Sequence, residues 1–252
     1  MIGASQFHQR GTAFGNFYDR YTVRTNVQGR PKNWLKVGVN VAASLEQTAG
    51  AGFWGGSGST SNNPYGGLSY TKNPLIPAVD ENGNVPEVMW ADGDYNTRYL
   101  IEMQPKQTDS YNLLGSFNVE IEPFKNFKIA SRAGVDAYVS KYGYTLIPSA
   151  DFSGGVGDRS RRFGIGYAAT ITNTLEYSFS IADAHNFVIL AGHEGVANQT
   201  DQFSASSAGF TDDRLMNLQD GKQDQFSVSE GFSQSRFLSF FGRLDYSILD
   251  KY

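Results

Sequence analysis

Hydrophobic and polar residues alternate along residues 108–140, in two arms that flank a short turn. In the first arm the apolar side chains occupy every second position: Tyr111, Leu113, Phe117, Val119 and Ile121. In the second arm they do so again: Phe127, Ile129, Ala133, Val135, Ala137 and Val139. A period of two residues predicts strands with one apolar and one polar face. Pro123 and Asn126 predict the turn of a hairpin between them.

The same alternation predicts further strands at 17–27, 35–46, 165–181 and 237–248. A strand at 187–197 is expected as the return arm after the turn at 183–186, although hydrophobic and polar residues alternate poorly there. Short turns are predicted at 28–33, 123–126 and 183–186, and a fourth is predicted to begin at 249–252. Long polar loops are predicted at 47–107, 142–163 and 198–231, and the second of them ends in the basic cluster Arg159–Arg162. The sequence therefore predicts an antiparallel meander of about seven strands, with short turns at one end and long loops at the other.

This layout favours an all-β, partial antiparallel transmembrane β-barrel that occupies residues 1–252. A strand needs about 9–11 residues to cross a bilayer, and outer-membrane barrels have short turns at one end and long loops at the other. An apolar belt is predicted on one face: Val37, Val39, Leu113, Phe117, Val135, Ile171 and Leu244. An aromatic girdle is predicted near the short turns: Trp34, Phe127, Tyr177, Phe179, Phe187 and Tyr246. The alternative is a soluble carbohydrate-binding β-sandwich, which would bury the apolar face between two sheets.

Composition narrows the function classes. Among 252 residues there are 28 glycines, 18 phenylalanines and 14 tyrosines, as a large β-structure with long loops requires, and there is no cysteine. The net charge of −4 argues against a nucleic-acid surface. No signal peptide opens the sequence and no apolar run is long enough for a spanning helix, so we expect a fragment of a longer protein.

Three short motifs are weak matches to known sites. Gly50–Gly55 has dinucleotide-binding spacing, but a glycine- and serine-rich run follows it where a helix would have to begin. Asp80–Asn84 begins like a calcium loop, but Val85 stands at the sixth position, where such a loop requires glycine, and Ala91 stands at the twelfth, where it requires glutamate. No second histidine follows His193-Glu194 at zinc-protease spacing. We therefore predict neither an enzyme nor a cofactor or metal site.

The aromatic residues of the first long loop are the candidate ligand site. Flat aromatic rings and guanidinium groups bind sugars and peptides. The candidate residues are Trp54, Trp90, Tyr95, Arg98 and Tyr99. The alternative is that these side chains pack the loop against itself.

Several segments resemble the barrel of SusC/RagA-type TonB-dependent outer-membrane transporters of Bacteroidetes. They are NLLGSFNVEIEPFKNFKIASRAGVD, HNFVILAGHEG and SRFLSFFGRLDYS in the strands, and NPLIPAVDENGNV followed by NTRYLIE in the first loop. The resemblance implies a multi-pass barrel of about 22 strands in outer-membrane lipid, with a plugged lumen. It also implies import of oligosaccharides or peptides, a SusD-like surface lipoprotein as partner, and energy from TonB through an N-terminal part. The sequence contains neither a plug domain nor an energy-coupling box.

Overall fold

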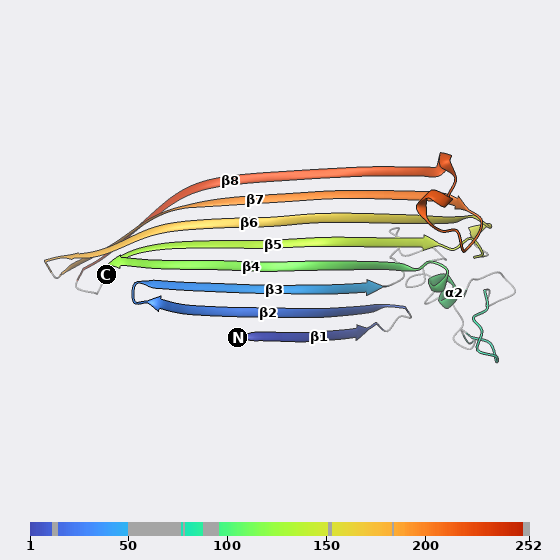
Figure 1. Ribbon diagram of the computed structural model, residues 1–252, viewed down its shortest axis with the longest axis horizontal. Helices are drawn as coiled ribbons and strands as arrows, with labels where there is room; N and C mark the ends of the chain where they lie inside the picture. Colours follow the sequence, from blue (N-terminus) through green and yellow to red (C-terminus); the bar gives the residue numbers. More distant parts are fainter. Residues whose placement is uncertain are drawn as a thin grey trace.

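The structure is a computed structural model that describes residues 1–11, 15–49, 77, 79–87, 96–150, 153–182 and 184–248. Its strands form one antiparallel sheet in which every strand lies beside its neighbours in sequence (Figure 1). The strands are β1 (Ile2–Arg10), β2 (Phe17–Lys32), β3 (Leu35–Ala49), β4 (Lys106–Phe124), β5 (Phe127–Leu146), β6 (Gly157–Ile181), β7 (His185–Phe210) and β8 (Phe226–Ile248). The predicted all-β meander is confirmed, with β1 as an additional, eighth strand.

The described strands belong to a single sheet, so the sandwich alternative is wrong. The apolar face that a second sheet would have buried is exposed instead. Phe117 is 47% exposed and Leu244 is 65% exposed. Soluble monomers rarely expose contiguous apolar surface beyond a few hundred Å².

The strands are longer than the alternation predicted. β5 continues to Leu146 and β6 begins at Gly157, so the basic cluster Arg159–Arg162 lies in a strand and not in a loop. β7 likewise continues to Phe210, well into the predicted loop 198–231. Beyond a bilayer both faces of a strand meet water, so backbone pairing continues there without hydrophobic alternation.

The short turns are tighter than predicted. β2 passes through a register shift between Gly29 and Lys32, and only Asn33 and Trp34 separate it from β3. Lys125 and Asn126 connect β4 and β5, and Asn126 has a positive φ of 68°. Asparagine tolerates this left-handed conformation because its side chain is short and polar. The predicted turn 183–186 also ends early, because β7 begins at His185.

The predicted apolar belt lies on one face of the sheet. Directly paired residues of adjacent strands point to the same side, and one such register row consists of Val39, Phe117, Ala133, Ile171, Gly195 and Leu238. The belt residues are exposed except Val37, which is half-buried. Neighbouring positions along each strand point to the opposite, polar face.

The belt runs obliquely across the register rows. On β4 the edge of the belt toward the long loops is Tyr111, which lies in the same register row as Phe232 of β8. On β8, however, polar residues follow Phe232, and the continuous apolar run begins only at Leu238. This edge therefore shifts by about six residues over four strand steps. The opposite edge, from Ile121 to Tyr246, shifts by about four residues. With a rise of about 3.3 Å per residue and about 4.8 Å between strands, the strands are inclined by about 35–45° to the normal of the belt.

The belt also has the height of a bilayer core. On β4 it spans Tyr111 to Ile121, about 34 Å along the strand and about 25 Å after correction for the inclination. Transmembrane barrels have strands tilted by about 35–45° and an apolar band about 25 Å tall. The inclination of this belt, obtained from the register, and its height, obtained from its span on β4, both match those of a transmembrane barrel.

An aromatic girdle borders the belt at the short-turn end, as predicted. Ring centroids of Tyr177 and Phe179 are 5.6 Å apart, those of Phe179 and Phe187 are 5.2 Å apart, and those of Phe187 and Tyr246 are 5.0 Å apart. Phe127 stacks on Phe124 at 4.8 Å. Aromatic side chains of this kind favour the interface between hydrocarbon and headgroups.

The buried residues of the described chain gather at the long-loop end. The short helix α2 (Thr97–Glu102), which is capped by Asn96, contributes three of the buried hydrophobic residues, and the others belong to loops and strand ends. They include Tyr99, Leu100, Ile101, Ala150, Phe210 and Met216. The backbone N–H of Ser149 donates to Asp213 at 3.0 Å and thereby joins the β5–β6 and β7–β8 loops. No helix in the described residues is long and apolar enough to cross a membrane.

Candidate functional site

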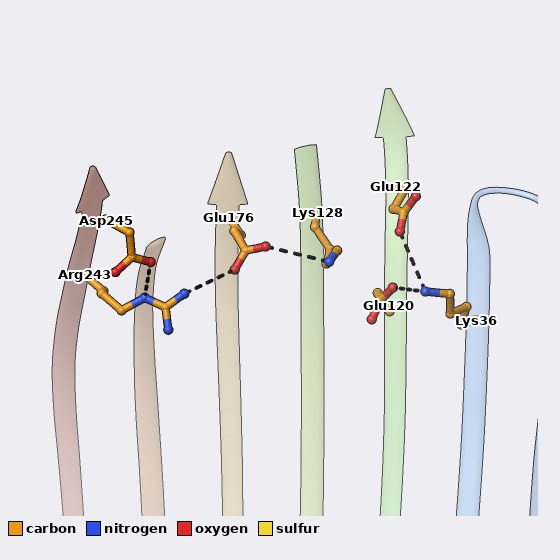
Figure 2. A network of polar contacts seen from close by, with 7 residues as sticks. All are labelled: Lys36, Glu120, Glu122, Lys128, Glu176, Arg243 and Asp245. Carbon is orange, nitrogen blue, oxygen red and sulfur yellow. Dashed lines mark hydrogen bonds and ion pairs between the residues drawn. The ribbon is translucent and has the colours of Figure 1, made fainter. Parts of the chain in front are cut away.

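Charged side chains of alternating sign cross the polar face near the short-turn end (Figure 2). Lys36 on β3 pairs with Glu120 on β4 and lies 3.7 Å from Glu122. Further along, Glu176 on β6 lies 3.7 Å from Lys128 on β5 and 3.8 Å from Arg243 on β8. The polar face of these strands therefore carries a row in which neighbouring side chains have opposite charges.

The Glu176–Arg243 contact reaches across an intervening strand. Glu176 pairs in register with Leu190 of β7, and Leu190 pairs with Arg243. The long Arg243 side chain spans this strand, and its Nε also lies 2.9 Å from Asp245. These side chains are partly exposed, so each pair contributes at most about 1 kcal/mol. The row therefore determines the electrostatics of this face more than the stability of the sheet.

A hollow of about 580 Å³ lies on the polar face at mid-height. Small residues, among them Ala42, Gly134 and Ala168, form its floor around Leu114. Leu114 is 58% exposed and interrupts the polar face. The lining also includes the apolar residues Met1, Val41 and Val135 and the charged or polar residues Arg24, Thr25, Asn26, Asn40, Ser116, Asp136 and Thr170.

Two glycines of the polar face lie beneath aromatic rings. A Cβ on Gly166 would lie 2.6 Å from the ring of Tyr138, its register partner. A Cβ on Gly192 would lie 2.6 Å from the ring of Phe241, which is its partner on β8. Each ring therefore covers a glycine and keeps the polar face shallow, as aromatic residues do when they cover glycines in designed sheets.

Two of the predicted ligand residues lie within the described chain. The Nε of Arg98 donates to Glu102 at 2.9 Å along α2, and the guanidinium is partly exposed. Tyr99 is only 5% exposed and belongs to the buried cluster at the long-loop end. Trp54, Trp90 and Tyr95 lie outside the described residues, so the ligand role of the five residues stays a prediction.

The histidines do not form a catalytic or metal-binding arrangement in the described residues, where no group of acidic residues and histidines could hold a metal ion. His185 Nδ1 lies 2.7 Å from the hydroxyl of Tyr246 in the aromatic girdle. His193 lies on the apolar face, where its Nε2 is 3.1 Å from the side-chain amide of Asn173. Each ring thus has a structural partner.

Comparisons with known proteins agree with this geometry. No family model matches the chain. TonB-dependent receptor P26 of Formosa agariphila is 25% identical over 258 residues, which cover 98% of this chain and 24% of the receptor. The structure of the RagAB peptide transporter matches 98% of this chain and 28% of its own, with 28% identity and a TM-score of 0.84. The RagAB peptide importer in its open-open state matches with 28% identity and a TM-score of 0.83, over 99% of this chain and 28% of its own.

These matches confirm the predicted resemblance to SusC/RagA-type TonB-dependent receptors, in sequence and in structure. They extend over nearly all of this chain, from the strands to the loop end. The chain spans about a quarter of the length of the proteins it matches.

Proposed function

We propose that this chain forms part of the wall of an outer-membrane transporter that imports peptides or oligosaccharides. The observation that carries the proposal is the oblique apolar belt, whose height of about 25 Å and inclination of about 35–45° fit a bilayer. Its apolar face contacts lipid, and the polar face lines a water-filled interior. The chain is a wall segment and not an enzyme.

The polar face suits a passage for hydrated solutes. The row around Lys36, Glu120 and Glu176 contains three cations and four carboxylates, so it presents charges of both signs to a passing solute. Above it, the hollow around Leu114 offers an apolar floor with Arg24 and Asp136 at its margins. Peptides carry both charges and apolar side chains, so this combination favours a peptide over an uncharged sugar.

The long-loop end is the proposed entry. Arg98 and Tyr99 lie there on α2, and with Trp54, Trp90 and Tyr95 they would contact the solute as it enters. We further propose that TonB supplies energy through an N-terminal part and that a SusD-like lipoprotein covers the entry. The resemblance to SusC/RagA-type transporters supports both partners.

Cysteine labelling tests the wall assignment directly, because the sequence contains no cysteine of its own. Single cysteines would be introduced along β4 from position 111 to 121 in the protein expressed from its full reading frame in the outer membrane. A membrane-impermeant, pore-sized maleimide should label the even positions, which face the interior, and leave the odd ones unlabelled. Uniform labelling, or labelling of the odd positions, would refute the wall assignment.

Uptake tests the transport assignment separately. Cells with the intact gene should accumulate labelled peptides, and cells without it should not. Deletion of TonB or collapse of the proton-motive force should abolish the uptake. Uptake of oligosaccharides but not peptides would refute the preference for peptides, and uptake independent of TonB would refute the energy coupling.

A further inference from the structure

Cationic side chains stand on the apolar face just beyond the belt, at the long-loop end. Lys141 follows Val139, the last belt residue of β5, on the same face of the strand. Arg161 lies on the neighbouring strand β6, two positions beyond Phe163, and Arg159 follows on the same face. With an inclination of about 40°, Lys141 and Arg161 lie about 5–10 Å beyond the edge of the belt.

No carboxylate of the described residues forms an ion pair with Lys141, Arg159 or Arg161. Asp109 is the register partner of Lys141. Its Oδ1 accepts hydrogen bonds from the amides of Gln107 at 2.8 Å and Gln47 at 3.2 Å instead. The Lys141 ammonium lies over the ring of Tyr111, 5.4 Å from its centroid.

Gly143 provides the place for the Arg161 side chain. The two residues are register partners, and a Cβ on Gly143 would lie 1.8 Å from Nη1 of Arg161. Nη1 of Arg161 therefore occupies the space that a side chain at position 143 would take. A hollow of about 450 Å³ opens beside it, lined among others by Lys141, Arg161, Phe163 and Phe203.

We propose that this hollow binds the phosphate group of an anionic lipid in the leaflet at the long-loop end. The cations would hold the phosphate, while the acyl chains lie against the belt below, beginning at Val139 on β5 and Phe163 on β6. The hollow is lined by the cations Lys141, Arg161 and Arg162 and by the carboxylate of Asp109, so its net charge is positive, and Arg159 lies further along β6 on the same face as Arg161. This inference rests on the proposed function, because only a wall with lipid on its apolar face places these residues at headgroup level.

The lipid is the occupant that the surroundings favour over a soluble anion. The hollow borders an apolar belt about 25 Å tall, which a soluble anion cannot cover. Each Lys or Arg near a membrane surface contributes about 1 kcal/mol to binding an anionic lipid. Guanidinium groups also pair with phosphate in a bidentate geometry, and the exposed Arg161 side chain carries such a group beside Gly143.

The test measures lipid retention by native mass spectrometry. The transporter that contains this chain would be reconstituted in nanodiscs of phosphatidylcholine doped with phosphorylated lipid A, or with the same lipid after phosphatase treatment. The phosphorylated lipid should be retained, and inorganic phosphate should not displace it. Lys141→Gln and R161Q should each weaken retention about fivefold, and the double variant about 25-fold.

Two further variants separate position from charge. Gly143→Ala keeps every charge but displaces the Arg161 side chain, so it should weaken retention about as much as R161Q. Arg132→Gln removes a cation from the polar face of the same strand and should change nothing. Equal retention of the phosphorylated and phosphatase-treated lipids, or unchanged retention in the double variant, would overturn the proposal. Displacement by inorganic phosphate would identify a site for a soluble anion and would overturn it as well.

The cysteine pattern along β4 serves as the fold control for each variant. If that pattern holds while lipid retention does not depend on Lys141 and Arg161, the lipid site is refuted and the wall assignment stands. If the pattern itself is absent, the wall assignment fails, and the lipid site fails with it.

Discussion

Replacing Phe117 by arginine should destabilise the protein in a membrane by about 2–4 kcal/mol. Phe117 lies near the middle of the belt on β4, between the edges at Tyr111 and Ile121. At about 2.5 Å of height per inclined residue, it is about 10–15 Å from either edge. An arginine on the lipid face costs about 2–4 kcal/mol at the midplane and about 0–1 kcal/mol near the interfaces.

Leu114→Arg is the matched control, because it places the same charge on the same strand but on the polar face. Leu114 is 58% exposed there, so its replacement removes little packing. Its expected cost is below about 1 kcal/mol. Tyr111→Arg, at the edge of the belt, should cost about 0–1 kcal/mol and would thus add a depth gradient.

The assay is denaturant unfolding of the full transporter in phosphatidylcholine vesicles, followed by tryptophan fluorescence. The free energy of unfolding of each variant is compared with that of the unaltered protein. If Phe117→Arg costs no more than Leu114→Arg, the apolar face does not meet lipid and the reasoning from the belt fails.

Further predictions concern the glycines, the sheet edges and a loop carboxylate. Gly192→Ala should cost about 1–3 kcal/mol in the same assay, because its Cβ would lie 2.6 Å from an aromatic ring and 2.9 Å from a backbone oxygen. The control Gly242→Ala should cost less than about 1 kcal/mol, because the nearest atom to its Cβ would be a backbone oxygen 3.5 Å away. Equal costs of the two substitutions would contradict the packing argument. The 252-residue chain expressed alone should aggregate through the unpaired edges of β1 and β8. If size-exclusion chromatography and circular dichroism show a soluble, monodisperse monomer that unfolds cooperatively, both this prediction and the membrane assignment are wrong. Hydrogen bonds from the Arg214 side chain hold the pKa of Asp212 at about 2, below its ordinary 3.8. The contact between Asp212 and Arg214 should therefore persist as pH falls from 7 to about 4 and be lost only as pH approaches 2. NMR of the Asp212 carboxyl carbon measures this titration, and a midpoint near 3.8 would contradict the prediction.

The belt could be predicted from the sequence because β4, β5 and β6 place apolar and polar residues at alternating positions. Phe117 and Ile171 were assigned to the lipid face on this basis alone, and their register confirms that they share it. β1 was missed because its residues do not alternate: Phe7 shares the polar face with Ser5, while Arg10 lies on the apolar one. Only pairing with β2 identifies this edge as a strand.

The candidate sites depend on contacts between distant residues, which periodicity does not encode. Lys36 and Glu120 are 84 residues apart in sequence and meet only because β3 and β4 align in one register. The position of Arg161 across Gly143 likewise requires the register of β5 and β6. A signal for the cationic group was nevertheless present, because positions 159 and 161 continue the apolar face of β6 with basic residues.

The described strands end at unequal heights above the apolar belt at the long-loop end. Beyond the lipid edge, β3 continues from Leu45 to Ala49, about 10 Å in height, whereas β7 continues from Ala197 to Phe210, about 30 Å. In the described strands one side of the opening therefore stands about 20 Å higher than the other. On the tall side, the paired strands β6, β7 and β8 continue the wall above the lipid edge. A partner that contacts these strand ends directly would have to follow this difference in height along the described strands.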